Sequence, residues 1–306
     1  MSGPRLQPLA LATSADYADL PPDDRLLIPA LEPYRLRGLP TVWDDTSIRW
    51  QDFAAVVIRS CWDYHLRLDE FLDWVSRVER LGVRVINSPA LLRWNAHKGY
   101  LNDLRHRGVA TVPTAWIERG SATSLASVLD EGGWEEAVVK PAVSASATNT
   151  WRVRNPPPVS AGEESRFRAL VDTSDVMVQP YIREIEQAGE WSLCFFRGEF
   201  SHAVVKRPVA GEFRVQEKHG GTSTLATPDA AVVTQAHSVV RVLPHRSCYA
   251  RVDGCVVNGR FRLMELEALE PSLFLDLHPA AAERFAAAIA ADIGVSTLQQ
   301  PSPPTF

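Results

Sequence analysis

The stretch Tyr249–Asp253 (Tyr-Ala-Arg-Val-Asp) and the stretch Leu263–Glu267 (Leu-Met-Glu-Leu-Glu) say most about the fold of this chain. Both are apolar segments interrupted by charged residues, as expected of strands with one polar face. Asn258 and Gly259 lie between them and form a strong signal for a tight β-hairpin turn. The sequence therefore predicts an antiparallel hairpin near the C-terminus.

This hairpin carries three carboxylates and an arginine. Side chains two residues apart on a strand share a face, so Glu265 and Glu267 project together, as do Arg251 and Asp253. Three acids on paired strands repel one another unless a cation joins them. Hard oxygen ligands of this kind suit Mg²⁺ carried with a phosphate. The competing interpretation is a solvated acidic edge of a hairpin.

The turn decides whether the three acids can meet. A strict two-residue turn at Asn258 and Gly259 would place Asp253 opposite Met264 and leave Glu265 on the other face. A three-residue loop with Gly259 in a left-handed bulge shifts the parity and brings the acids together. We expect the three-residue loop.

Further motifs precede the hairpin in a fixed order. Lys98 begins a helical stretch, and Lys140 ends the β-branched run Ala137–Lys140. A loop of small residues follows at Ser144–Thr150. The order continues with a strand that runs into a proline linker, a basic strand end, a basic segment and a glycine pair: Val176–Ile182, Lys206, Phe213–Gln216 and Gly220–Gly221.

The joint order of these motifs resembles the ATP-grasp superfamily of carboxylate–amine ligases, from about residue 95 to the C-terminus. The resemblance implies an α/β ATP-grasp fold, in which a small parallel-sheet N-terminal domain precedes two α+β subdomains that clamp ATP. The corresponding divisions are an N-terminal domain at residues 1–94, a central subdomain at 95–178, a C-terminal subdomain with the metal site at 179–296 and a tail at 297–306.

The N-terminal part narrows the resemblance. Val56–His65, Asn87–Pro89 and Trp94–Asn95 are similar to a small bacterial ATP-grasp group related to glutathione synthetase. That group includes the cyclo-ligase of cycloserine biosynthesis, which closes O-ureidoserine. The resemblance thus implies an ATP-dependent carboxylate–nitrogen ligase with an amino-acid-like substrate.

The resemblance also implies how ATP is held. Lys98 and Lys140 would contact the α- and β-phosphates, and the loop with Ser144 and Ser146 would close over them. This loop contains no glycine, which departs from the family pattern and puts its mobility as a lid in doubt. The backbone of the linker would read adenine and one of two glutamates would hold the ribose, with these residues involved: Gln179, Tyr181, Ile182 and either Glu184 or Glu190.

Metal and transfer chemistry would follow on the C-terminal strands. Lys206 would face the γ-phosphate, and Arg214 and Arg251 would hold the substrate carboxylate and the acyl phosphate made from it. Asp253, Glu265 and Glu267 would bind two Mg²⁺ ions. Many relatives have Asn in place of Glu267, so its extra charge leaves room for Mn²⁺.

A substrate pocket is expected after the strand Ala54–Ile58, because ligands of parallel sheets collect at the carboxyl ends of strands. Arg59 offers a fork for a carboxylate, and Asp63 could pair with an ammonium group. For Trp62 the alternative is a structural turn. The full set of candidate substrate residues is Arg59, Ser60, Trp62, Asp63, Tyr64, Gly221 and Ser272.

Three classes of function compete at this point. A ligase needs both a carboxylate and a nitrogen nucleophile, and the sequence leaves open whether they belong to one molecule (ring closure) or two (amide or peptide ligation). A small-molecule kinase would release a stable phosphorylated product. A non-catalytic nucleotide-binding module should have lost its metal ligands, yet all three acids are present.

Composition agrees with a soluble cytoplasmic enzyme. The 306 residues carry a net charge of −5 without an offsetting basic stripe, which argues against a nucleic-acid partner. No long apolar run or secretory leader is found, so we expect no membrane partner. The four cysteines show no metal spacing and are expected to be reduced thiols. A homodimer is left open.

Strands and helices alternate in the N-terminal part, which predicts a small parallel sheet. The expected strands are Leu9–Ala12, Thr41–Trp43, Ala54–Ile58 and Val83–Ile86, and the expected helices are Asp24–Arg35, ended by Gly38, and Leu68–Arg80. Pro156–Gly162 is expected as a surface loop, and later helices are expected at Lys98–His106, Leu125–Glu131, Pro228–Val240 and Pro279–Ala291.

Overall fold

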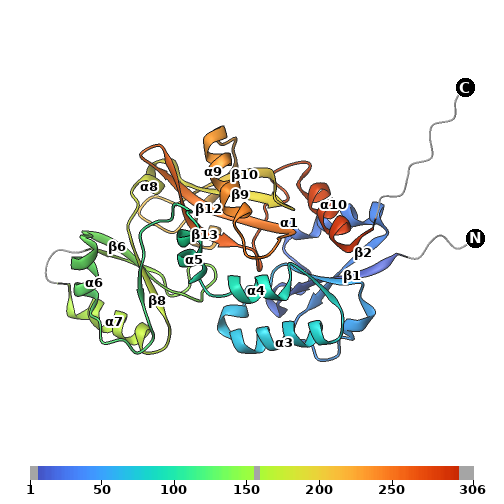
Figure 1. The fold of residues 1–306 in the computed structure, drawn as a ribbon, viewed down its shortest axis with the longest axis horizontal. Coiled ribbons are helices and arrows are strands. Elements are labelled where there is room, and N and C mark those ends of the chain that lie inside the picture. Colours follow the sequence, from blue (N-terminus) through green and yellow to red (C-terminus); the bar gives the residue numbers. More distant parts are fainter. Residues whose placement is uncertain (1–5, 155–158, 296–306) are drawn as a thin grey trace, which may run out of the picture.

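The computed structural model describes residues 6–154 and 159–295 and contains three sheets, one in each third of the chain (Figure 1). The N-terminal sheet is parallel, in the order β2-β1-β3-β4, as the alternation of elements predicts. Its strands are β1 Gln7–Thr13, β2 Leu36–Val42, β3 Ala55–Ile58 and β4 Arg84–Ile86. The helices of this part are α1 Pro22–Arg25, α2 Leu27–Leu31, α3 Leu68–Arg80 and α4 Pro89–Asn95.

Two N-terminal expectations were wrong. The strand expected at Thr41–Trp43 starts earlier and ends before Trp43, because β2 spans Leu36–Val42. The segment expected as a single helix, Asp24–Arg35, is divided into α1, α2 and a 3-10 turn at Glu32–Tyr34, and Arg35 ends it in the left-handed conformation with φ of 58°. Gly38 does not end a helix but pairs with Leu9 inside β2. A Cβ at Gly38 would lie 3.0 Å from Leu11 Cδ1, so glycine serves close packing here.

The central third forms an antiparallel sheet in the order β5-β8-β6-β7. Its elements are α5 Tyr100–His106, β5 Ala115–Ile117, α6 Leu125–Gly132, β6 Glu136–Pro141, β7 Trp151–Arg154, α7 Ala161–Val171 and β8 Val176–Pro180. The sequence reading missed β7 and α7. The expected surface loop falls partly on residues 155–158, which lie outside the described residues, and Ser160 caps α7 by accepting a hydrogen bond from the Glu163 backbone N–H at 3.2 Å.

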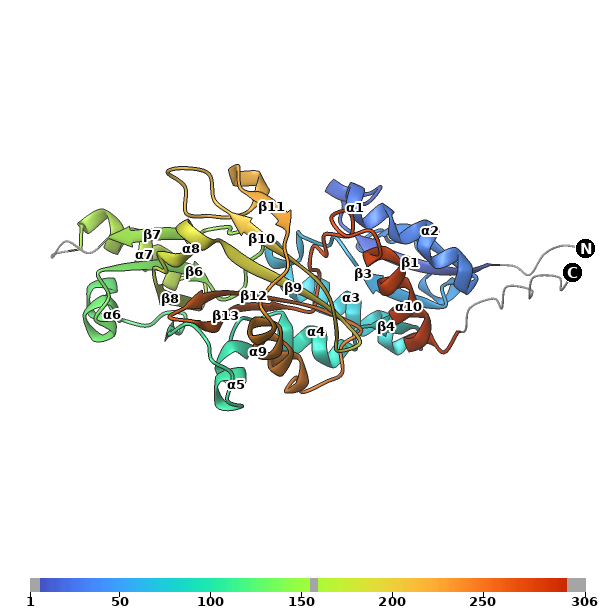
Figure 2. The same ribbon diagram turned by 90° about the horizontal axis from the view of Figure 1, so that it is seen from above.

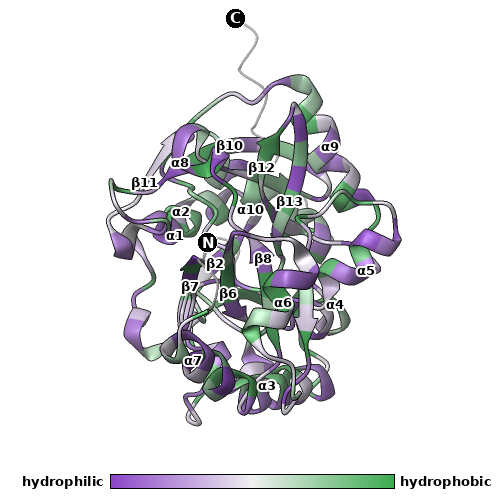
Figure 3. Ribbon diagram, turned by 90° about the vertical axis from the view of Figure 1, so that its left-hand side faces the viewer, coloured by the Kyte–Doolittle hydropathy of each residue, from purple (hydrophilic) through white to green (hydrophobic). Residues whose placement is uncertain are grey.

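The last third is a five-stranded sheet in the order β11-β10-β9-β12-β13. Its elements are α8 Glu184–Ala188, β9 Glu190–Phe196, β10 Glu199–Arg207, β11 Thr222–Leu225, α9 Ala230–Arg241, β12 Tyr249–Val257, β13 Arg260–Glu267 and α10 Ala281–Ile293. Figure 3 shows green, hydrophobic segments on interior strands and more purple, hydrophilic segments on the outer helices. The tail at 297–306 lies outside the described residues.

The predicted hairpin forms, but the shift in strand pairing that we expected at the turn lies within the strands. Val257 pairs with Arg260, so Asn258 and Gly259 form a two-residue turn, with φ of 51° and 73°. The expected three-residue loop was therefore wrong, although the positive φ of Gly259 was right.

The shift that decides which side chains share a face lies further along the two strands. Gly254 pairs with Leu263 whereas Asp253 pairs with Glu265, so Met264 is the extra residue of a β-bulge. The backbone of Leu263 also bonds a third segment, because its N–H donates to Ala110 O at 2.9 Å and its carbonyl accepts from the Val112 N–H at 3.0 Å. The bulge thus brings Asp253 and Glu265 opposite each other, as the shared-site hypothesis requires.

The N-terminal sheet and the C-terminal sheet are fastened together by polar side chains. Asn87 donates to Tyr249 O at 2.9 Å and to Ala268 O at 2.7 Å, and the hydroxyl of Tyr249 donates to Ile58 O at 3.0 Å. Helix α10 shares one hydrophobic core with α2, β1 and β9, and Figure 2 shows it beside the N-terminal sheet. This arrangement fixes the wall of the cleft described next.

No helix in the described part of the chain is both long and apolar enough to cross a membrane. The four cysteines are all buried and free, as expected.

Candidate active site

A cavity of about 620 Å³ opens where the three parts of the molecule meet, and most of the predicted site residues line it. The central subdomain and the residues just before it contribute Lys98, Lys140, Ser144 and Ser146. The linker and the start of β9 contribute Gln179, Tyr181, Ile182 and Glu190. The C-terminal sheet and its loops contribute Lys206, Arg214, Arg251, Asp253, Glu265 and Glu267, and the remaining predicted members are Trp62, Tyr64 and Ser272.

Asp253 is the most tightly held acid of the site. Its carboxylate accepts hydrogen bonds from Arg251 Nε at 2.9 Å and Nη2 at 2.8 Å and from the Ser192 hydroxyl at 2.5 Å. Lys206 Nζ lies 3.5 Å away. Burial alone would raise the pKa of Asp253, but the charges of Arg251 and Lys206 outweigh it and lower the pKa to about 2.

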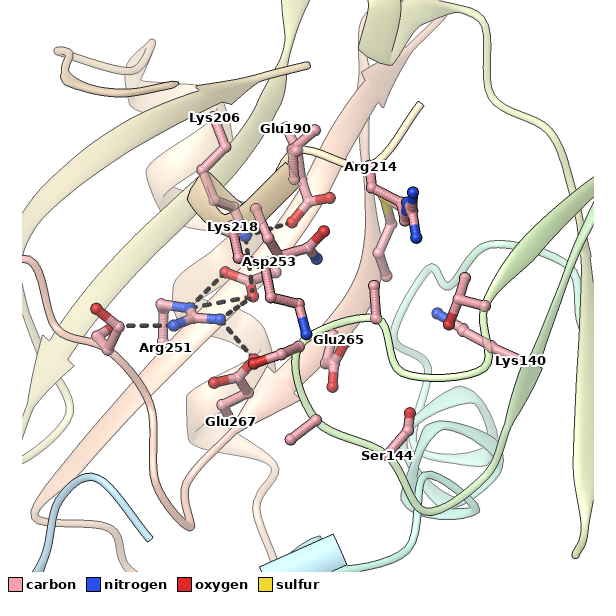
Figure 4. Close-up of a pocket in the computed structure, with 18 of the residues that line it drawn as sticks. Lys140, Ser144, Glu190, Lys206, Arg214, Lys218, Arg251, Asp253, Glu265 and Glu267 are labelled. Atoms are coloured by element: carbon pink, nitrogen blue, oxygen red, sulfur yellow. Dashed lines mark hydrogen bonds and ion pairs between the residues drawn. The ribbon is translucent and has the colours of Figure 1, made fainter. Parts of the chain in front are cut away.

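The other charged groups are paired in the same way (Figure 4). Arg251 Nη2 also donates to Glu267 at 2.5 Å. Lys206 Nζ lies 2.6 Å from Glu190. Burial raises the pKa of Glu267 to about 7, with Arg251 acting in the opposite direction. Arg251 therefore bridges two of the acids predicted to bind metal.

Two lysines face the C-terminal sheet from across the cleft. Lys98 Nζ lies 2.9 Å from Glu265 and donates to Ser144 O at 2.8 Å, so it ties the small-residue loop to β13. Lys140 forms no ion pair with any residue that the structure describes, and burial lowers its pKa. A half-buried cation without a carboxylate partner is suited to an anionic group of a ligand.

The carboxylates of the cleft can bind a hard cation only when a phosphate draws away the lysine and arginine that now pair with them. Within the described residues, no three His, Cys, Asp or Glu side chains are close enough to form a metal site by themselves. The oxygens of Asp253, Glu265 and Glu267 are instead occupied by arginine and lysine. These cations can turn to the phosphates of a nucleotide and free the carboxylates, so metal binding by the three acids stays a prediction.

The expected substrate role of Arg59 was wrong. This side chain is fully buried, does not line the cavity, and donates to Asp24 Oδ1 from Nε at 2.9 Å and from Nη2 at 2.6 Å. Nη2 also donates to Pro271 O at 2.9 Å. Its guanidinium is therefore part of the core between the N-terminal domain and the loop after β13.

Two neighbours of Arg59 are likewise turned away from the cavity. The hydroxyl of Ser60 is buried against Thr13 Oγ1 at 2.7 Å. Asp63 pairs with Arg67 at 2.6 Å and accepts from the Trp43 indole N–H at 3.0 Å, so both of its oxygens are engaged away from the cavity. The indole of Trp62 and the ring of Tyr64 do reach the cavity.

Two further candidates lie outside the cavity lining. Glu184 is in the first turn of α8 and does not line the cavity. Of the two glutamates expected to hold the ribose, only Glu190 lies in the cleft. Gly221 does not line the cavity, and its backbone packs so closely on Val215 that a Cβ would collide with the Val215 carbonyl. Glycine is needed here to close the loop before β11.

The sequence reading missed several lining residues, among them Tyr17, Asp23, Lys218 and Glu270. Tyr17 and Trp62 pack edge to face with ring centroids 4.7 Å apart. No local pattern marks Tyr17, Asp23 or Lys218, because they lie in short helical turns that only the tertiary fold brings to the cleft. Glu270 could have been found, since it lies two residues before Ser272, a predicted substrate residue.

Comparisons with known proteins agree with this geometry. Residues 9–87 match the family model described as the N-terminal domain of D-cycloserine synthetase DcsG. The cycloserine biosynthesis protein DcsG of Streptomyces lavendulae is 32% identical over 302 residues, which covers 92% of this chain and 97% of that protein.

Solved structures extend the comparison to the fold. The crystal structure of D-cycloserine synthetase DcsG matches with a TM-score of 0.84 at 29% identity, over 94% of this chain and 99% of that one. The ATP-grasp ligase PsnB, complexed with minimal precursor, Mg and ADP, matches with a TM-score of 0.62 at 14% identity, over 94% of this chain and 98% of that one. The predicted ATP-grasp fold is confirmed.

Proposed function

The chain belongs to the ATP-grasp ligases, in the family of the cycloserine biosynthesis protein DcsG, and from this premise we propose that it closes an O-ureidoserine-like amino acid into a ring. ATP-dependent carbon–nitrogen ligation is the activity of this family. The observation that carries the proposal is the cleft itself, in which the lysines, arginines and acids expected for phosphoryl transfer line one cavity.

The cations of the cleft are suited to a nucleotide triphosphate. Lys98 and Lys140 face the cavity from the central side, where they would contact the α- and β-phosphates as compact charges. Lys206 would turn from Glu190 toward the γ-phosphate. The loop with Ser144 and Ser146 would cover the phosphates, and Lys98 already holds it through Ser144 O.

The linker after β8 would receive the adenine. The segment Gln179–Ile182 lines the same cavity, so its backbone can read the edge of the base. We assign the ribose to Glu190 because it lies in the cleft and Glu184 does not.

Asp253, Glu265 and Glu267 would hold the Mg²⁺ that accompanies ATP, and Glu267 leaves room for Mn²⁺. A bound divalent ion supplies charge neutralisation for the crowded phosphates. Two ions are the expected number.

In the proposed reaction the substrate carboxylate attacks the γ-phosphorus of ATP, and ADP leaves. Arg251 and Arg214 would stabilise the carboxylate and the acyl phosphate that results. A nitrogen of the same substrate molecule then attacks the acyl carbon, and phosphate leaves. The cavity walls must exclude water meanwhile, because a mixed anhydride hydrolyses readily.

We place the enzyme in the cytoplasm, since its buried cysteines are free thiols. A homodimer stays a prediction.

The deciding assay incubates the enzyme with ATP, Mg²⁺ and O-ureidoserine and without a second amine. Release of phosphate together with a cyclic product is expected. Turnover that appears only after an external amino acid is added would replace ring closure by intermolecular ligation, and a stable phosphorylated substrate would indicate a kinase.

A further inference from the structure

Glu270 has no cationic partner among the described residues, a property that it shares with Asp23 and Asp276 of the cavity lining but not with the acids of β9, β12 and β13. Its residue is 7% exposed, and it lines the cavity. Glu190, Asp253, Glu265 and Glu267 each lie within 3 Å of a lysine or arginine nitrogen, whereas no ion pair or side-chain hydrogen bond of the Glu270 carboxyl is found among the described residues. A carboxyl that opens into the cavity without a cation beside it is suited to a partner that arrives with a ligand.

The backbone around Glu270 is held with unusual completeness. Four consecutive carbonyls, from Glu270 to Leu273, each accept a hydrogen bond from a buried or half-buried side chain. The donors are Trp62 Nε1 to Glu270 O at 3.0 Å, Arg59 Nη2 to Pro271 O at 2.9 Å, Arg251 Nη1 to Ser272 O at 2.9 Å and His202 Nε2 to Leu273 O at 2.8 Å. We call residues 270–273 the anchored segment.

The main effect of this anchoring is to hold the side chains of the segment in a fixed position. The donors come from the N-terminal domain, β12 and β10, so the anchored segment is fixed relative to the N-terminal and C-terminal walls of the cavity. A group held by such supports keeps its geometry during a reaction. The two side chains of the segment that line the cavity are those of Glu270 and Ser272.

Relative to Asp253, Glu265 and Glu267, Glu270 lies toward the N-terminal domain, where its backbone accepts a hydrogen bond from Trp62. Its charge acts on the hydroxyl of Tyr64, where burial and then Glu270 raise the pKa. Burial, and then the charge of Glu267, raise the pKa of Glu270 to about 8, so it is the ionised fraction of Glu270 that can accept a proton. The nucleotide would occupy the opposite end, near Gln179–Ile182. Glu270 therefore lies where the carboxylate substrate and its attacking nitrogen would sit.

We propose that Glu270 is a catalytic residue that accepts a hydrogen bond from the attacking nitrogen of the substrate and takes its proton as the C–N bond forms. The nitrogen lone pair attacks the acyl carbon, the bond from that carbon to the phosphate oxygen breaks, and inorganic phosphate carries the electron pair away. The proton released by the nitrogen passes to a carboxylate oxygen of Glu270. A ureido nitrogen is a weak nucleophile, so a proton acceptor in contact with it is needed for attack.

This inference rests on the proposed ligase reaction but concerns only its second half. Glu270→Gln keeps the size of the side chain and removes the proton acceptor. The acyl phosphate should still form, so ADP release in the presence of hydroxylamine, with the hydroxamate as trapped product, should stay within about threefold of wild type. Formation of the cyclic product should fall by about 10²-fold or more, in line with the usual contribution of a general base.

The matched control is Glu265→Gln, which removes an acid of the predicted metal site and should lose both hydroxamate and cyclic product. Thermal unfolding of both variants reports whether they fold. Unchanged cyclisation in Glu270→Gln would overturn the proposal, and so would a parallel loss of hydroxamate and cyclic product in a folded variant.

Failure of the ring-closure proposal is seen separately, in wild type. If wild type makes no cyclic product but joins O-ureidoserine to an added amine, the same comparison is made on that amide. The role of Glu270 is then judged by the ratio of amide to hydroxamate, which should fall by the same factor in the variant.

Discussion

Replacing Arg59 with Met should destabilise the whole protein, since Arg59 is part of the core and not of the substrate pocket. Arg59 and Asp24 form a buried ion pair in which the two side chains are 0% and 2% exposed. The variant keeps much of the apolar bulk of the arginine but leaves the Asp24 carboxylate buried without its cation. It also leaves Pro271 O without the donor of the anchored segment.

The expected magnitude follows from the burial of the pair. Removing one partner of a fully buried ion pair costs about 3–5 kcal/mol, because an uncompensated charge stays in the core. For a protein with an unfolding free energy of about 5–15 kcal/mol, this is a large fraction of the total. The second substitution, Asp24→Leu in the Arg59→Met background, should recover part of the loss since no buried charge remains.

A matched control is available in the same loop. Arg67 pairs with Asp63 at 2.6 Å and with Asp44 at 2.8 Å, but its side chain is 35% exposed. Arg67→Met should therefore cost at most about 1 kcal/mol. Urea unfolding followed by far-ultraviolet circular dichroism measures all three variants and wild type. If Arg59→Met were no more destabilising than Arg67→Met, the buried pair would not hold the domains as inferred.

Other substitutions test the site, the bulge and the pH response. Glu265→Ala should lower ATP turnover by about a thousandfold with little change in circular dichroism, because it removes a group that acts on the transferred phosphate. Retention of a tenth of the activity would contradict the metal assignment. Gly254→Ala should lower the free energy of unfolding in urea by about 1–3 kcal/mol, since a Cβ there would collide with the Arg262 carbonyl. The control Gly162→Ala, near the start of α7, should be neutral or slightly stabilising. Burial lowers the pKa of His202 to about 4 from its ordinary 6.5, so the unfolded chain binds this proton first as the pH falls. The contribution of His202 to the free energy of unfolding should thus decrease by about 2 kcal/mol between pH 7 and pH 5. It is measured as the difference between wild type and a His202→Gln variant, because the raised pKa values of Glu267 and Glu270 act in the opposite direction in both proteins.

The sequence alone determined the elements whose patterns are local. The helix Leu68–Arg80 was predicted with its observed bounds, because its apolar residues repeat with helical spacing and no proline interrupts them. The strands that carry Lys140, Lys206 and Asp253 were predicted from their β-branched or alternating residues. The order of these charged residues was sufficient to indicate the ATP-grasp fold.

Only the tertiary structure decided which charged residues face the cleft. Arg59 has the chemistry of a carboxylate ligand, but Asp24 from another element takes its guanidinium into the core, and nothing local in the sequence shows this. The parity of the hairpin is set by the bulge at Met264, because Leu263 pairs with the distant segment Ala110–Val112. Contacts between distant segments leave no periodic signal in the chain, so burial, pairing and the isolation of Glu270 follow from packing alone.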